Sequence, residues 1–247
     1  MSFAAIVASL HARTGKTLLA RVLADYFILS GRRPLLFDTD VAECRLSASF
    51  PHATMVVDPA NVPDQMTLFD SLALAAPEAR VVDVSHQAYR KFFRVMHDIR
   101  FVPEARERNV EPVIFYIADR NADSYEEALQ LSERSGGCTL VAVENALLGL
   151  PSEPVRRSSA YQAFVKQELH MTMPVLDPAA ALALAEPAFS LSTFMREPLG
   201  LGDIPLAPQS SPLDARGPLR SWVLKVFKDV HRISRAVPAG SVPVAQG

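Results

Sequence analysis

The sequence is poor in the features that mark secreted, membrane-spanning and metal-binding proteins. Its 247 residues hold two cysteines, Cys44 and Cys138, whose spacing suits neither a disulfide nor a metal site and which fit a reducing compartment. No apolar run reaches the roughly 18 residues that cross a bilayer. The first apolar stretch, residues 3–10, is too short for a signal peptide and lacks its basic start. We therefore expect a cytoplasmic protein.

The chain also lacks an excess of one charge sign, since its net charge is −2. Of its residues, 49% are hydrophobic, as in folded soluble proteins. The charge is nevertheless unevenly spread. From Asp203 onward the chain has six Lys or Arg residues and three acidic ones, so its end is basic and the rest is acidic. This asymmetry predicts a separate role for the C-terminal segment.

A phosphate-binding motif lies near the start of the chain. Gly15-Lys16-Thr17 follows the apolar run 3–8 and opens a stretch with helical periodicity. In such loops the glycine lets backbone N–H groups approach phosphate oxygens, the lysine reaches the β- and γ-phosphates, and the threonine hydroxyl ligates Mg²⁺. The helix N-terminus adds a favourable potential for anions. The alternative is a strand-to-helix turn that contains these residues by chance.

Apolar runs alternate with helical stretches along the body of the chain, which predicts an α/β fold with a mostly parallel sheet of about seven strands and helices on both faces. The predicted strands are 3–8, 34–38, 54–57, 80–84, 112–117, 139–143 and a short one around 173–176. The predicted helices are 16–30, 65–75, 87–108, 123–134, 158–169, 179–185 and 219–237. We divide the chain into a nucleotide-binding domain (1–197), a Pro-rich linker (198–218), a basic amphipathic helix (219–237) and a flexible tail (238–247).

Carboxylates follow two of the predicted strands. Asp38 and Asp40 end the second strand, and Asp83 ends the apolar run Val81-Val82. The carboxyl ends of parallel strands converge on one crevice, so these side chains could hold Mg²⁺ and orient an attacking water. A single Asp at a strand end is more often a turn or helix cap.

These motifs resemble the ParA/MinD class of P-loop ATPases, in which a helix follows Gly-Lys-Thr, ends in a Gly-Arg turn and leads into a buried strand and an Asp-x-Asp. The first forty residues carry the close similarity, with Gly31-Arg32 as the turn and Asp38-Thr39-Asp40 as the acidic motif. The resemblance implies a P-loop NTPase fold, ATP and Mg²⁺ as cofactors, a nucleotide-dependent homodimer and a protein partner.

The resemblance also assigns roles to single residues. Lys16 and Asp40 would be catalytic, to which we add Arg13 because of its place inside the loop, and the metal would be held by Thr17, Asp38 and Asp83. Asn145 would read the adenine edge, which an amide can do because it both donates and accepts hydrogen bonds. The implied nucleotide-binding residues are Ala12, Arg13, Thr14, Gly15, Lys16, Thr17, Leu18 and Asn145.

The chain departs from the family in the first half of the loop. The family's signature lysine, five residues before the invariant one, is His11 here, and the two following glycines are Ala12 and Arg13. The cation that reaches across the dimer is therefore missing, which puts dimer-coupled hydrolysis in doubt. Arg13 could replace it at the γ-phosphate, since a guanidinium suits phosphate oxygens, or could simply face solvent.

Apolar side chains recur at three- and four-residue steps between Leu219 and Ile233, with the chain's only tryptophan, Trp222, among them and basic residues on the remaining face. This pattern is typical of a helix that lies on a membrane surface, and the MinD-like proteins that the chain resembles have such a segment. It is equally typical of a helix that packs back on its own domain or on a partner. Nucleic-acid contact has weak support from the basic and aromatic stretch 89–94 and from Arg156-Arg157.

We expect an ATP-binding, Mg²⁺-dependent ATPase that acts as a switch in positioning or partitioning a cellular cargo. Nucleotide binding, metal binding and a role as a switch are predicted from the residues, whereas the role in positioning is implied by the family resemblance. The alternatives are a small-molecule kinase, which would also combine a P-loop with Asp-x-Asp, and a non-hydrolysing interaction protein or an accessory of conjugal DNA transfer.

Overall fold

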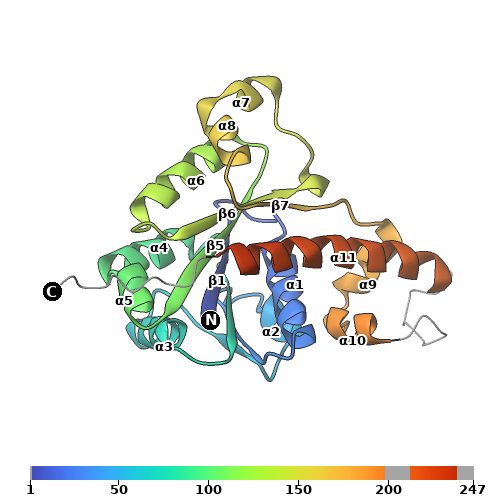
Figure 1. Ribbon diagram of the computed structural model, residues 1–247, viewed down its shortest axis with the longest axis horizontal. Coiled ribbons are helices and arrows are strands. Elements are labelled where there is room, and N and C mark those ends of the chain that lie inside the picture. Colours follow the sequence, from blue (N-terminus) through green and yellow to red (C-terminus); the bar gives the residue numbers. More distant parts are fainter. Residues whose placement is uncertain (1, 198–211, 238–247) are drawn as a thin grey trace.

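Seven strands form one parallel sheet in the computed structural model, which describes residues 2–197 and 212–237. The strand order is β3-β2-β4-β1-β5-β6-β7, so the strand before the phosphate loop lies at the centre (Figure 1). The strands are β1 (Ser2–Ala8), β2 (Pro34–Asp38), β3 (Thr54–Val56), β4 (Ala79–Asp83), β5 (Val110–Ala118), β6 (Thr139–Asn145) and β7 (His170–Met173). The predicted α/β fold is confirmed, and all the pairings are parallel.

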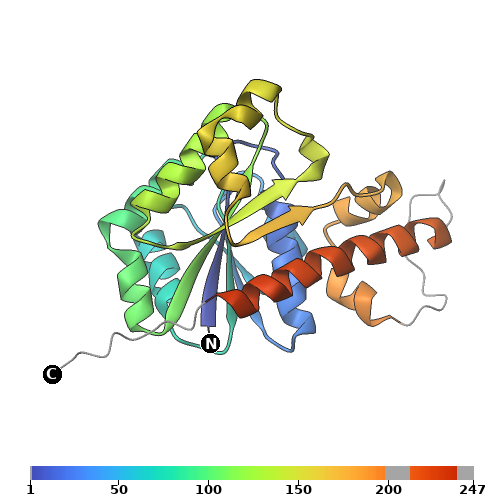
Figure 2. The same cartoon turned by 45° about the horizontal axis from the view of Figure 1, so that its top comes forward.

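Helices cover both faces of the sheet because alternate strand residues point to opposite sides. Ala5 and Val7 belong to one apolar core, and Ala4 and Ile6 belong to the other. The first core is covered by α1 (Lys16–Leu29), α2 (Arg45–Ser49), α9 (Pro178–Ala185), α10 (Leu191–Arg196) and α11 (Pro212–Ala236). The second is covered by α3 (Val62–Ala73), α4 (Tyr89–Asp98), α5 (Phe101–Glu107), α6 (Ala122–Arg134), α7 (Glu153–Arg157) and α8 (Ser159–Val165) (Figure 2).

The predicted helix 87–108 is wrong as one element, because the chain breaks between α4 and α5. Arg100 adopts a left-handed conformation with φ of 53° at the break. Pro103 has no N–H for the carbonyl of Ile99, and its ring would clash there, so a continuous helix cannot pass this point. The same proline is tolerated in the first turn of a new helix.

Three short helices, α2, α7 and α10, and a strand shift were not predicted. The last strand was predicted at residues 173–176, but β7 covers His170–Met173. It ends there because Pro174 cannot donate to a sheet ladder. The last helix begins at Pro212, so residues 212–218 of the predicted linker are helical, with Pro218 inside the helix. The rest of the predicted linker (198–211) and the predicted tail (238–247) lie outside the described residues.

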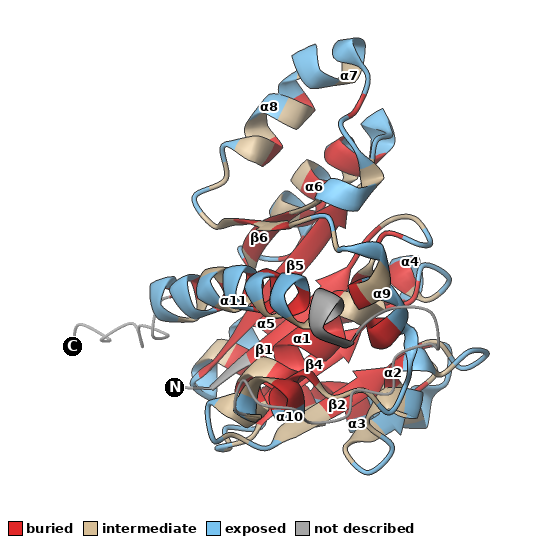
Figure 3. Cartoon of the chain, turned by 90° about the vertical axis from the view of Figure 1, so that its right-hand side faces the viewer, coloured by how far each residue is buried: buried red, intermediate tan, exposed pale blue. Residues whose placement is uncertain are grey.

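The apolar stripe of α11 faces the body of the protein. The helix packs against α1, α9 and β7, and the Trp222 indole N–H donates to the Pro174 carbonyl oxygen at 2.7 Å. Side chains of the stripe that are fully or almost fully buried are Leu219, Trp222, Val223, Val226, Val230 and Ile233. Figure 3 shows the exposed side of the helix turned outward.

Of the two interpretations of this pattern, the structure therefore has the helix packed on its own domain. A membrane anchor needs an exposed apolar face, and this one is covered. The helices of the described residues include none that is both long and apolar enough to span a bilayer.

Candidate functional site

The predicted phosphate loop, residues 9–17, connects β1 to α1 at the carboxyl edge of the central strand. Gly15 has φ of 99°, which residues with a side chain rarely adopt. A Cβ atom at this position would lie 2.8 Å from Nδ2 of Asn145. The glycine is therefore required twice, for the turn and for the close approach of β6.

The first turn of α1 is open to an anion. Its N-cap is Gly15, which offers no side-chain oxygen to the free N–H groups, and no acidic residue lies in the first turn. Uncapped N–H groups and the helix dipole together attract phosphate. Lys16, the first residue of α1, donates from Nζ to the carbonyl oxygen of His11 at 2.7 Å. Burial lowers the pKa of Lys16, while the nearby carboxylates Asp83 and Asp40 act in the opposite direction.

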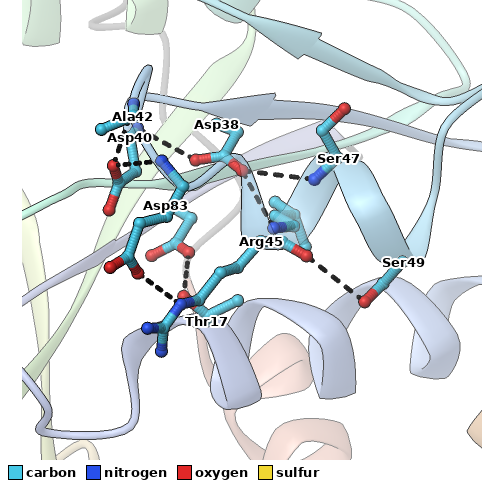
Figure 4. A network of polar contacts seen from close by, with 10 residues as sticks. Thr17, Asp38, Asp40, Ala42, Arg45, Ser47, Ser49 and Asp83 are labelled. Carbon is cyan, nitrogen blue, oxygen red and sulfur yellow. Dashed lines mark hydrogen bonds and ion pairs between the residues drawn. The ribbon is translucent and has the colours of Figure 1, made fainter. Parts of the chain in front are cut away.

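Thr17 and Asp83 meet although 66 residues separate them. The Thr17 hydroxyl donates to Asp83 Oδ2 at 2.6 Å, since β4 lies beside β1 in the sheet (Figure 4). Burial raises the pKa of Asp83 to about 7. Its other oxygen, Oδ1, is buried and has no hydrogen-bond partner among the described residues. A buried carboxylate oxygen without a donor is costly, and a cation would offset that cost, so this residue fits a metal ligand.

Asp38 is held by the backbone of the following loop. Its Oδ1 accepts from the N–H of Asp40, and its Oδ2 accepts from the N–H groups of Leu46 and Ser47. Figure 4 shows these bonds at the start of α2. Burial raises the pKa of Asp38, and the three N–H donors counteract the rise. Both of its oxygens are therefore engaged, and the side chain orders the turn after β2.

Asp40 has one engaged oxygen. Its Oδ1 accepts from the N–H groups of Ala42 and Glu43, at 3.3 and 3.1 Å. The side chain lies near Asp38 and Asp83 at the ends of β2 and β4 (Figure 4). The structure thus brings all three predicted carboxylates to one edge of the sheet beside Thr17, although they differ in how many oxygens the protein already uses.

The predicted cation Arg13 is exposed on the loop. Its φ is 59°, a left-handed conformation that residues with a side chain rarely adopt. Ala12 is also exposed, Thr14 is buried and Leu18 packs partly against the core. The Thr14 hydroxyl oxygen has no hydrogen-bond partner within the described part of the chain.

His11, at the position of the family's signature lysine, lies against two carboxylates of its own chain. Its Nδ1 lies 2.7 Å from Asp119 Oδ2, and its Nε2 lies 3.4 Å from Asp123 Oδ2. These three side chains also form the cluster of metal-binding residue types found in the described ranges. The two carboxylates approach opposite nitrogens of the imidazole ring, so the ring lies between them. Sequence reasoning missed both acids, which follow β5.

Asn145, predicted to read a base, contacts the loop between β1 and α1 in this structure. Its Nδ2 donates to the carbonyl oxygen of Thr14 at 2.9 Å, and its Oδ1 accepts from the N–H of Leu147 at 3.1 Å. Both ends of the amide are thus engaged, and the residue holds the second half of the loop against the end of β6. A base-reading role remains a prediction.

Comparisons with known proteins give likenesses of structure. No protein-family model matches the sequence, and no curated protein matches it. Among 35 matching chains of solved structures is the septum site-determining protein MinD of Pyrococcus horikoshii OT3 complexed with Mg-ADP. The two share 14% identity over 95% of this chain and 98% of the other, with a TM-score of 0.46.

Two structures from Aquifex aeolicus are similar to the same degree. The cell division protein MinD shares 12% identity over 98% of this chain and 99% of the other, with a TM-score of 0.45. A chain of the MinC:MinD complex shares 12% identity over 100% and 99% of the two chains, with a TM-score of 0.43. At these identities the functional residues of this chain must be judged from its own geometry.

Proposed function

We propose that this protein binds ATP with Mg²⁺ at the carboxyl edge of β1, β2 and β4 and hydrolyses it slowly as a nucleotide switch. One observation carries the proposal. An uncapped helix N-terminus with Lys16 and Thr17 lies against Asp83, a buried carboxylate with an unpartnered oxygen. This combination offers donors for phosphate and oxygen ligands for a hard cation side by side.

Each residue has a distinct task in this proposal. The N–H groups of the loop and the Lys16 ammonium bind the phosphates, and Lys16 must leave the carbonyl of His11 to do so. Thr17 and Asp83 hold the metal, and Asp38 keeps the adjoining turn in place. When bound, Mg²⁺ supplies charge neutralisation at the phosphate oxygens. Asp40, with one oxygen free of backbone donors, orients the attacking water.

The biological role follows from the sequence resemblance to the ParA/MinD class. There the nucleotide controls a homodimer that positions or partitions a cargo through a protein partner, and we propose the same use here. The first half of the loop favours a second candidate, a protein that holds ATP with little turnover. The observation behind it is that His11 is engaged with Asp119 and Asp123, which leaves Arg13 as the loop's only other cation before Lys16.

Titration calorimetry tests the binding site directly. ATP and ADP are titrated into the full chain with and without Mg²⁺, and into the Lys16→Ala variant. We expect Mg²⁺ to tighten ATP binding and Lys16→Ala to weaken it about 100-fold, because loss of a charged donor in a preorganised site costs several kcal/mol. Arg156→Ala, an exposed change on α7, is the matched control and should bind as the wild type does.

The products of a long incubation with Mg-ATP identify the reaction that the bound nucleotide undergoes. Free phosphate indicates hydrolysis, a phosphorylated small molecule in a mixture of candidate acceptors indicates a kinase, and unchanged ATP favours the non-hydrolysing candidate. Absence of binding heat with every purine triphosphate tested would contradict the proposal as a whole.

A further inference from the structure

Two exposed helix faces of opposite charge are left unexplained by the proposed nucleotide site. The first, which we call the acidic row, lies on α6 and consists of four exposed residues: Asp123, Glu126, Gln130 and Glu133. The second, which we call the basic row, lies on α11 and consists of four exposed residues: Lys225, Lys228, Arg232 and Arg235.

The two rows have the same spacing. In each, the four members follow one another at steps of three, four and three residues. Such steps keep side chains on one side of an α-helix, as at the a and d positions of a heptad. Each row is therefore a stripe about 15 Å long, since its ends are ten residues apart and each residue of a helix rises about 1.5 Å.

Most charges of the two rows have no partner inside the molecule. Five of the side chains make no ion pair and no side-chain hydrogen bond with another described residue: Glu126, Glu133, Lys225, Lys228 and Arg235. Asp123 lies 3.4 Å from His11 Nε2, but its side chain is 59% exposed. Arg134, a basic residue beside the acidic row, pairs with Glu127 at 2.8 Å and does not neutralise the row.

The free charges match when the two helices lie side by side and run in the same direction. Three oppositely charged pairs then form, namely Lys225 with Asp123, Lys228 with Glu126 and Arg235 with Glu133. The fourth place joins Arg232 to Gln130, which has no charge. Arg232 needs no further carboxylate, because it pairs with Asp229 at 3.3 Å and donates to the His170 carbonyl oxygen. With the helices running in opposite directions, the free Lys228 would face Gln130.

The two rows cannot meet within one molecule. The buried side of α6 belongs to the apolar core on one face of the sheet, and the buried side of α11 belongs to the core on the other face. The rows lie on the sides of these helices that point away from the cores. Each molecule therefore presents one row of each sign on opposite faces, and a contact between the rows requires two copies.

We propose that the basic row of α11 binds the acidic row of α6 on a second copy of this chain, in a weak head-to-tail contact. The match in spacing and charge between two rows of the same sequence favours a second copy as the partner of the basic row. A head-to-tail contact leaves one free row at each end, so further copies can add. The contact does not use the nucleotide site and should form without ATP.

Sedimentation velocity of the full chain without nucleotide tests the contact. At about 20 mM NaCl the weight-average sedimentation coefficient should rise with protein concentration beyond the value of a dimer, whereas at about 500 mM NaCl it should remain that of the monomer, because salt screens exposed charges. Absence of association at low salt overturns the proposal, and so does association that is equally strong at high salt.

Reversal of the charges at two of the three pairs tests which faces are in contact. Lys228→Glu/Arg235→Glu and Glu126→Lys/Glu133→Lys should each be monomeric at low salt, because both rows of each variant then have excess charge of the same sign. The variant with all four substitutions has the net charge of the wild type and complementary rows again, so it should associate as the wild type does.

Arg156→Glu/Lys166→Glu is the matched control, because it changes the net charge as Lys228→Glu/Arg235→Glu does, at exposed positions outside both rows. It should associate as the wild type does, and circular dichroism checks that every variant is folded. Three results overturn the proposal: equal loss of association in the control, failure of the fourfold variant to associate, or a monomeric wild type whose basic row instead binds a labelled DNA duplex or anionic vesicles.

Discussion

The two halves of the phosphate loop are built differently. Residues 14–17 are fixed to neighbouring strands, through Asn145 on the Thr14 carbonyl and Thr17 on Asp83. Residues 10–13 are more exposed, and the side chain of His11 lies against the segment after β5. The half that we propose to bind phosphate is thus tied into the sheet. In the other half, His11 stands where the ParA/MinD class has its signature lysine, and its side chain lies against carboxylates of the same chain.

The difference separates binding from turnover. In the proposed function, phosphate binding depends on N–H groups, Lys16 and Thr17, all in the half that is held by the sheet. Acceleration of hydrolysis needs additional positive charge at the γ-phosphate, and Arg13 is the exposed basic residue of the other half. Substitutions in each half of the loop, and in the residues that hold it, test this separation.

Arg13→Ala should have the largest effect on turnover. If Arg13 supplies the missing charge, the hydrolysis rate falls about 100-fold, whereas ATP affinity changes by less than threefold. Phosphate release and calorimetry measure the two quantities. Arg13→Lys should recover only part of the rate, because an ammonium lacks the planar fork of the guanidinium. An unchanged hydrolysis rate in Arg13→Ala would show that Arg13 faces solvent and does not contribute to catalysis.

Gly15→Ala should weaken ATP binding on the order of 30-fold. The new Cβ would push Asn145 off the Thr14 carbonyl and would force φ of 99° on a residue with a side chain. Gly31→Ala is the matched control, because Gly31 has φ of 77° but no atom within 4 Å of the new Cβ. It should cost about 1–2 kcal/mol of stability and leave the affinity for ATP unchanged. Equal affinity losses in the two variants would indicate a general backbone effect.

Asp83→Asn should reduce the contribution of Mg²⁺ to ATP affinity about tenfold, since the amide keeps an acceptor for Thr17 but loses the negative charge. The same change should raise the melting temperature of the ligand-free protein at pH 8, because it removes a buried carboxylate with an unpartnered oxygen. Calorimetry with Mg²⁺ and thermal melts in EDTA give the two readouts. Asp70→Asn, an exposed change on α3, should alter neither.

His11→Lys should have the smallest effect, less than threefold on hydrolysis, although it restores the residue typical of the family. Asp119 and Asp123 would pair with the new ammonium as they contact the imidazole now. Adding Asp119→Asn and Asp123→Asn should free the lysine and raise the rate in a manner that depends on protein concentration, if a dimer forms. A large gain from His11→Lys alone would show that the two acids do not hold residue 11.

The strands and the acidic strand ends could be predicted because they depend on local signals. Buried parallel strands are continuous apolar runs, and Asp38 and Asp83 close two of them visibly. Helix α4 and the stripe of α11 have clear periodicity, so their existence was predictable even where their ends were not. The break at Arg100 and the early start at Pro212 depend on how prolines sit in a helix, which composition alone does not show.

The contacts of the loop could not be predicted because they depend on the order of strands. His11 lies near Asp119 because β1 and β5 are paired, with Ala8 beside Tyr116. No local sequence pattern predicts that β5 is the neighbour of β1. Asn145 reaches Thr14 across a sequence separation of 131 residues. Its pairing with the loop follows from the end of β6 lying near Gly15, which only the folded chain reveals.

The central position of β1 has a consequence for synthesis of the chain. This strand leaves the ribosome before its partners, which begin near residues 79 and 110, so its edges stay unsatisfied until both have emerged. At about 5–20 residues per second that wait lasts several seconds. A nascent polypeptide truncated before β5 would expose the apolar segment 4–8 on one side, and we expect such fragments to depend on chaperones or to aggregate.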